Sequence, residues 1–215
     1  MKIAVFDRME ECTDAEVQRM LPLVSPQRRE QALRFRHLFG RFCCLKSWLM
    51  LQDLILECTK PNESFTSRLR GIYMSSMDTF RYNEHGKPYL EGGPFFSISH
   101  CKTGIAVAVS DEPVGIDIEQ IRSAGADLIE RTMNEEEQRL IREAEQPDRT
   151  FTRLWTQKEA IVKCQGIGIE SFEQLQTVLN DAQWTLDTIE KEKYIVSIAY
   201  GQLRSFSAKV QTADL

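Results

Sequence analysis

The chain contains the segment Val114-Gly115-Ile116-Asp117-Ile118-Glu119, in which apolar and acidic residues alternate. Residues i and i+2 of a β-strand point to the same face of the sheet. Asp117 and Glu119 should therefore project together, while Ile116 and Ile118 face the opposite way into the core. We predict a strand over residues 114–119 that presents two carboxylates on one face.

A second segment further along the chain has the spacing of a helix: Phe151-Thr152-Arg153-Leu154-Trp155-Thr156-Gln157-Lys158-Glu159-Ala160-Ile161-Val162-Lys163. Glu159 and Lys163 are neighbours at i and i+4, where the simplest interpretation is a surface ion pair contributing about 0.2–0.5 kcal/mol. Lys158 points along the apolar stripe of this helix. Its ammonium must reach the surface, pair with another group or meet an anionic ligand.

Together the two segments offer three carboxylates for a hard cation and lysines for a phosphate. Mg²⁺ prefers oxygen ligands and tends to complete its shell with water and substrate phosphates. For the Asp-x-Glu pair taken alone, an exposed strand face with unrelated acids is the simpler interpretation. A further strand end, Phe95-Phe96-Ser97-Ile98-Ser99-His100, adds hydroxyls that can donate to phosphate oxygens.

The composition indicates a folded globular chain. It has 215 residues, of which 42% are apolar and 27% charged, enough for one large domain or two small ones. A net charge of −5 excludes a nucleic-acid binder held by overall charge. The stretch 28–41 is nonetheless rich in arginine, and such a local patch suits a small polyanion or an acidic protein partner.

The sequence also indicates a compartment. The apolar start is too short for a signal peptide, and no apolar run approaches the length of a membrane span. The six cysteines show no CxxC pair and no histidine at zinc spacing, so we expect reduced thiols in a cytosolic protein.

Periodicity and turn signals predict the remaining elements. We expect a helix over residues 26–57 that could break near Gly40, and helices over 135–144 and 148–164, the last stopping at Gly166. We expect a strand over residues 105–110, and because its residues 105–109 lack polar alternation, we expect it to be covered on both faces. The other expected strands cover residues 2–6, 80–82, 89–90, 95–99, 175–179, 183–189, 194–200 and 206–210. This order predicts an α+β chain of two similar halves that meet near residues 110–113.

These residues resemble the signature of a known family, the 4'-phosphopantetheinyl transferases. The resemblance is carried by the three quoted segments, by Gly86-Lys87-Pro88, and by Ser25-Pro26-Gln27-Arg28-Arg29-Glu30 with Arg34-Phe35. It covers roughly residues 1–205, in order, and is similar to the larger, surfactin-synthetase-activating class. It implies an intramolecular pseudo-dimer. Its N-terminal half (1–112) would carry the coenzyme A 3'-phosphate and adenine side, and its C-terminal half (113–215) the metal and catalytic residues.

The resemblance further implies an activity. Members transfer the phosphopantetheine arm of coenzyme A, with Mg²⁺, to a serine of an apo acyl, peptidyl or aryl carrier protein and release adenosine 3',5'-bisphosphate. The expected protein is a cytoplasmic enzyme, monomeric because one chain supplies both halves, with no nucleic-acid or membrane partner. The particular carrier and pathway are not specified by the sequence.

By resemblance, the metal and catalytic roles fall on the two central segments. Asp117, Glu119 and Glu159 would hold Mg²⁺ against the pyrophosphate. Glu159 would also take the serine proton, directly or through water. Lys158 and Lys163 would hold the phosphates, with Lys163 neutralising charge on the transferring group.

The coenzyme contacts fall mainly on the N-terminal half. Arg28 and His100 would hold the 3'-phosphate, Ser99 would lie beside the coenzyme, and Lys87 and Pro88 would lie near the adenine. Two positions depart from the family pattern and leave the full 3'-phosphate clamp undefined. They are Gln31, where many relatives have a basic residue, and Cys44, where relatives often have a residue with a phosphate-binding hydroxyl.

Two other functions remain open from the residues alone. The acids and lysines also suit another Mg²⁺-dependent transferase that acts on a nucleotide-like pyrophosphate. A carrier-protein binder without catalytic activity is the alternative from a different class, although intact acidic and lysine positions count against it.

Overall fold

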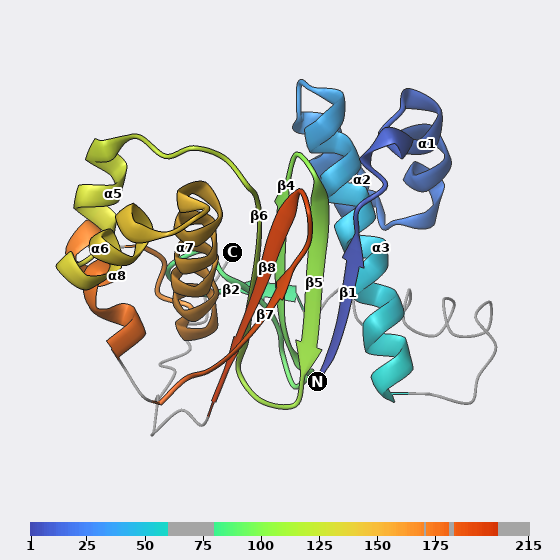
Figure 1. Cartoon of the computed structure of the whole chain (residues 1–215). Helices are drawn as coiled ribbons and strands as arrows, with labels where there is room; N and C mark the ends of the chain where they lie inside the picture. Colours follow the sequence, from blue (N-terminus) through green and yellow to red (C-terminus); the bar gives the residue numbers. More distant parts are fainter. Residues whose placement is uncertain (60–79, 170, 181–182, 202–215) are drawn as a thin grey trace.

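The computed structural model describes residues 1–59, 80–169, 171–180 and 183–201. Strands form the middle of the molecule, and helices flank them on two sides (Figure 1). On one side lie α1 (Asp14–Met20), α2 (Pro26–Arg34) and α3 (Leu38–Thr59). On the other lie α5 (Ala126–Thr132), α6 (Glu135–Glu143), α7 (Pro147–Gln165) and α8 (Phe172–Thr177). This mixture confirms the predicted α+β class.

The two larger sheets share one connectivity. In the first, β1 (Lys2–Phe6) pairs antiparallel with β5 (Gly104–Ser110), which also pairs with β4 (Phe95–Cys101), giving the order β1-β5-β4. In the second, β6 (Val114–Gln120) pairs with β8 (Tyr194–Tyr200), which also pairs with β7 (Thr185–Glu190). In each sheet the first strand lies beside the last, and the last is central. The connectivity supports two similar halves, whereas the pseudo-dimeric symmetry and the boundary at residues 112/113 stay predictions.

The two halves are joined at β4 and β6. Ser97 Oγ accepts a hydrogen bond from the backbone N–H of Ile116 at 3.0 Å. One pleat further, Ser99 Oγ donates to Asp117 Oδ1 at 2.7 Å. These side-chain bonds place the two most informative strand segments of the sequence next to each other.

Each sheet buries one face against a long helix. The helix α3 packs Phe42 and Leu45 into the same core as Val107 of β5, and all three are fully buried. All seven residues of β5 are buried, as their uninterrupted apolar pattern predicts. The helix α7 covers the second sheet, with Ala160 beside Ala199 of β8.

The close approach of α7 to β6 depends on Gly115. A Cβ atom at this position would collide with the backbone carbonyl of Ala160 and the backbone amide of Cys164. Glycine therefore lets α7 lie against the strand that carries Asp117. The helix then ends at Gly166, whose φ of 76° is the left-handed conformation that glycine adopts without strain.

Two expected elements are corrected by the structure. The helix expected over residues 26–57 is two helices, because Phe35 is extended (φ −69°, ψ 128°) and ends α2. The break does not lie at Gly40, which is inside α3 under the ring of Phe35. The strand expected over residues 175–179 is wrong, since Ser171 caps a helix there and buries Leu175.

Other predicted elements are confirmed with small shifts of their ends. The helices expected at 135–144 and 148–164 are α6 and α7, and β4 continues through His100 to Cys101. The small hairpin β2 (Phe80–Tyr82) and β3 (Pro88–Leu90) is present. The short helices α1 and α5 were not predicted, and the strand expected at 206–210 lies outside the described residues. Within the described ranges, no helix is both long and apolar enough to cross a membrane.

Candidate active site

A cavity of about 410 Å³ collects five of the predicted site residues. Arg28 comes from α2, Pro88 from β3, Ser99 and His100 from β4, and Lys163 from α7. The remaining lining is largely apolar and aromatic and comprises Gln31, Phe35, Gly40, Cys43, Cys44, Ser47, Trp48, Tyr82, Phe96 and Ile98. Residues far apart in the sequence thus form a single cavity with cationic groups and flat apolar walls.

Arg28 is held at the start of α2 in a position suited to an anion. Ser25 caps this helix, its Oγ accepting from the N–H of Arg28 at 3.1 Å. The guanidinium lies 3.7 Å from the centre of the Trp48 ring, and its Nη1 lies 3.6 Å from Cys44 Sγ. No carboxylate pairs with it among the residues that the structure describes. Gln31 and Cys44, the two departures from the family pattern, line the same cavity.

Asp117, Ser99 and Lys163 form a tight polar cluster at the junction of the halves. Lys163 Nζ lies 2.5 Å from Asp117 Oδ1 and donates to Ser99 Oγ at 2.9 Å. Asp117 is 2% exposed, and its Oδ2 is buried without a hydrogen-bond partner in the described part of the chain. A buried carboxylate oxygen without a partner is costly unless a ligand completes it.

Glu159 and Glu119 share the electrostatic field of this cluster. Burial raises the pKa of Glu159 to about 7; the Lys163 charge lowers this pKa, while Asp117 and Glu119 raise it. Burial and then Asp117 also raise the pKa of Glu119, against the lowering effects of Arg122, Lys163 and Trp155. The three predicted metal carboxylates therefore act on one another. As arranged here, no three His, Cys, Asp or Glu side chains of the described residues form a metal-binding group.

His100 lies near the end of β4 on the cavity wall, as predicted. Its ring meets Phe39 edge-on, with centroids 6.0 Å apart. Desolvation, followed by the Lys163 charge, lowers the pKa of His100. The imidazole is thus predominantly neutral at pH 7 until an anion offsets these effects.

Lys87 lies against the C-terminal end of α7, and its place near an adenine stays a prediction. Its ammonium donates to the carbonyls of Lys163 at 2.5 Å and of Cys164 and Val114 at 3.4 Å. Burial lowers its pKa. Lys87 therefore caps the C-terminal end of α7, where a cation also complements the helix dipole. Asn83 supports this contact by donating to the carbonyl of Gly166 at 2.7 Å.

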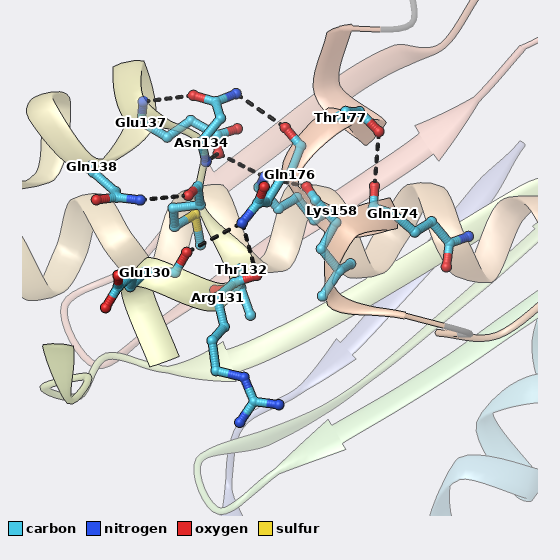
Figure 2. A network of polar contacts seen from close by, with 12 residues as sticks. Glu130, Arg131, Thr132, Asn134, Glu137, Gln138, Lys158, Gln174, Gln176 and Thr177 are labelled. Atoms are coloured by element: carbon cyan, nitrogen blue, oxygen red, sulfur yellow. Dashed lines mark hydrogen bonds and ion pairs between the residues drawn. The ribbon is translucent and has the colours of Figure 1, made fainter. Parts of the chain in front are cut away.

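Lys158 is not brought into the cavity. Its side chain is fully buried, and its Nζ donates to Glu137 Oε2 at 2.7 Å and to the carbonyl of Leu175. Glu137, labelled beside Lys158 in Figure 2, belongs to α6, and Leu175 belongs to α8. Of the three alternatives for this lysine, namely the surface, an internal partner or an anionic ligand, the structure shows an internal partner. The contact of Lys158 with phosphate stays a prediction.

Sequence reasoning missed several residues of this region. Trp48 and Tyr82 line the cavity but belong to no quoted motif, and Phe96 lies within the segment 95–100 without having been given a role of its own. The pairing of Glu137 with Lys158 could not be predicted either, because the Asn134-x-x-Glu137 spacing indicates only a capping box. That capping box was the one available signal of a fixed acidic partner for Lys158.

Comparison with known proteins finds similarity to one family. Residues 113–210 match the model of the 4'-phosphopantetheinyl transferase superfamily. The transferase gsp of Aneurinibacillus migulanus is 29% identical over 73% of this chain and 65% of its own length. The transferase psf-1 of Bacillus pumilus is 31% identical over 72% of this chain and 63% of its own. The transferase AcpT of Salmonella typhi is 36% identical over 54% of this chain and 66% of its own length.

The second half of the chain is thus similar to the 4'-phosphopantetheinyl transferase superfamily. The similarity spans slightly less than two thirds of the length of each of these relatives.

Proposed function

We propose that this protein is a holo-[acyl-carrier-protein] synthase. It would transfer the phosphopantetheine arm of coenzyme A to a serine of an apo acyl, peptidyl or aryl carrier protein. The observation that carries the proposal is the cavity that joins Arg28 and His100 with Lys163, next to the buried Asp117. The relatives named above are themselves called 4'-phosphopantetheinyl transferases. We extend the proposal to a cytoplasmic monomer that needs neither nucleic acid nor a membrane.

The cavity suits a nucleotide with several phosphates. Trp48, Tyr82 and Pro88 supply flat apolar surface for a base. Arg28 and a protonated His100 would hold the 3'-phosphate with charge-assisted hydrogen bonds. Ser99 and Lys163 would meet the pyrophosphate.

The carboxylates are proposed to hold Mg²⁺. The buried, unpartnered Oδ2 of Asp117 and the mutually coupled Glu119 and Glu159 are a donor set of the type that Mg²⁺ prefers. When bound, the cation would act as a Lewis acid that neutralises charge on the pyrophosphate. Lys163, now on Asp117, would be free to contact the phosphates once the cation takes over part of that carboxylate.

The proposed transfer forms one phosphorus–oxygen bond and breaks another. The serine oxygen of the carrier forms a bond to the phosphorus next to the pantetheine arm, and the bond from that phosphorus to the bridging oxygen breaks. Adenosine 3',5'-bisphosphate leaves with the bridging oxygen and its negative charge. Glu159 would take the serine proton, directly or through water, because its carboxylate lies in the same cluster as Lys163 and Asp117. Lys163 stabilises the developing charge.

The test is a transfer assay read by mass spectrometry. Purified protein, coenzyme A, Mg²⁺ and an apo carrier are expected to give a carrier heavier by one phosphopantetheine arm. A carrier whose acceptor serine is replaced by alanine controls for non-specific attachment. Absence of the mass increase across acyl, peptidyl and aryl carriers would overturn the proposal.

A further inference from the structure

The helix α7 presents two different faces. Successive residues of an α-helix are rotated by about 100°. Glu159 and Lys163 therefore lie on one face, toward Asp117 of β6. Lys158 lies about 140° around the axis from Lys163 by the same geometry, and it is directed to α6 and α8. One helix thus carries reactive groups on one face and a buried ammonium on another.

The surroundings of Lys158 form a connected polar network. Glu137 Oε2 accepts from both Lys158 Nζ at 2.7 Å and the backbone N–H of Asn134 at 2.8 Å. Asn134 Nδ2 donates to the carbonyl of Gln176 at 3.1 Å, and the Gln176 side chain donates to two carbonyls at the end of α5. Figure 2 shows how these contacts tie α5, α6, α7 and α8 together at Lys158.

Lys158 cannot readily leave this network for a ligand. It is fully buried, and Glu137 is 5% exposed. Withdrawing the ammonium would leave a buried carboxylate without its cation, which is a strongly unfavourable state. The pair is therefore expected to persist whether or not a nucleotide occupies the cavity.

We propose that Lys158 is a positioning residue, which through Glu137 fixes the rotation of α7 so that Glu159 and Lys163 face Asp117. This inference rests on the proposed function, and it assigns to Lys158 a role other than contact with phosphate. The expected consequence follows from geometry, since displacement of catalytic groups by about 1 Å costs on the order of 10²-fold in rate.

The experiment compares Lys158→Met, Glu137→Gln and the double variant in the full chain. Methionine keeps most of the volume of lysine, and glutamine keeps an acceptor for the N–H of Asn134. We expect Lys158→Met to lower kcat at least tenfold, while the Kd for coenzyme A, measured by calorimetry, stays within twofold. Because both residues act as one unit, the double variant should lose no more activity than Lys158→Met alone.

A matched control separates positioning from general loss of stability. Met20→Ala removes a side chain of α1 that is 2% exposed and does not line the cavity. It should lower the melting temperature and leave kcat within twofold at 10 °C. Lys158→Met, melting well above that temperature, should still show its loss of kcat.

The outcomes are distinct. A tenfold weaker Kd for coenzyme A in Lys158→Met, with Glu137→Gln unaffected, would place Lys158 on the phosphates and overturn the inference. An unchanged kcat in folded Lys158→Met would overturn it as well. If the wild-type protein transfers nothing, the proposed function fails. In that case the coenzyme A Kd of Lys158→Met still tests the inference: an unchanged Kd supports a role of Lys158 away from the phosphates, and a weakened Kd overturns that role.

Discussion

Asp117 is the residue on which the two halves converge. It receives Ser99 from β4 and Lys163 from α7, while its own strand belongs to the second sheet. The alternation in residues 114–119 predicted its direction correctly, because a period of two places acids on one side of a strand. Its partners could not be predicted in the same way, since they depend on contacts between elements.

The first prediction concerns the charge of Asp117. Asp117→Asn keeps the shape but removes the charge that faces Lys163 and the proposed cation, so kcat should fall by roughly 10²-fold or more. Initial rates over a series of Mg²⁺ concentrations measure the effect, with Asp111→Asn, an exposed site, as the matched control. Rates near those of the wild type at low Mg²⁺ would contradict the assignment.

The second prediction concerns the stability of the divalent-free protein as pH changes. The pKa of Glu159 is raised from 4.5 to about 7, so the folded state holds this proton more tightly than the unfolded state. The residue's contribution to stability is therefore greatest below pH 4.5 and is lost as pH rises through 7. Glu159→Gln should lack this loss.

Urea unfolding at pH 5 and pH 8 in the presence of a chelator tests this sign. The free energy of unfolding of the wild type, relative to Glu159→Gln, should be lower at pH 8 than at pH 5. The opposite trend would show that Glu159 is stabilised as a carboxylate rather than desolvated.

At the scale of elements, the helices and strands that could be predicted from the sequence were the long ones, and the short ones depended on contacts with other parts of the chain. The long periodic segment that forms α7 was predictable, whereas residues 175–179 (Leu-Gln-Thr-Val-Leu) are too few to distinguish strand from helix by their pattern. Ser171 decides in favour of a helix by capping it, its Oγ accepting from the N–H of Gln174 at 3.3 Å. A break near Gly40 was expected in the first long helix; it falls at residues 35–37, where Phe35 ends α2 and its ring lies over Gly40 of α3.

The third prediction tests the contact between α7 and β6. Gly115→Ala introduces a methyl group where backbone atoms of Ala160 and Cys164 lie, so α7 must move away. We expect a loss of about 1–3 kcal/mol in the free energy of unfolding and a larger fractional loss of kcat than of coenzyme A affinity. Gly125→Ala is the matched control, since nothing lies within 4 Å of its added Cβ. Equal behaviour of the two variants would contradict this role of Gly115.

The fourth prediction tests the buried pair as a stability element. Lys158→Met leaves Glu137 buried without its cation and should reduce the free energy of unfolding by about 3–5 kcal/mol. Glu137→Gln combined with Lys158→Met removes both charges and should recover part of that loss. Chemical denaturation of Lys158→Met, Glu137→Gln and the double variant measures their free energies of unfolding. A double variant less stable than Lys158→Met would contradict the pairing.

At the scale of the whole molecule, the structure brings several of the predicted site residues together, while the roles given to them stay predictions. Arg28, Ser99, His100 and Lys163 line one cavity. Two motif lysines make internal contacts that fix α7: Lys87 donates to carbonyls at the C-terminal end of the helix, and Lys158, on the helix itself, pairs with Glu137 of α6. A motif records which residues are present, whereas the direction of each side chain is set by the packing of elements far apart in the sequence.

The charge distribution of the whole molecule leads to the last prediction. The overall charge is negative, yet α2 and the turn after it are rich in arginine and expose Leu33 (50%) and Phe35 (46%). Arg41 Nε donates to the carbonyl of Phe35 at 2.9 Å, and Arg34 pairs with Glu30 at 2.7 Å. Arg36, exposed on the same turn, is therefore the residue whose charge can be reversed with least effect on the fold.

Carrier domains of this kind are expected to be acidic, so a basic and apolar surface beside the cavity suits them. Steering by exposed charge acts mainly on the association rate and is screened by salt. Arg36→Glu should therefore raise the KM for carrier protein severalfold at low ionic strength, with little change at high salt or in the KM for coenzyme A. Arg19→Glu, an exposed arginine of α1, is the matched control. If Arg139→Glu on α6 raises the carrier KM instead, the docking surface lies on the second half, because electrostatic steering follows the charge nearest the contact.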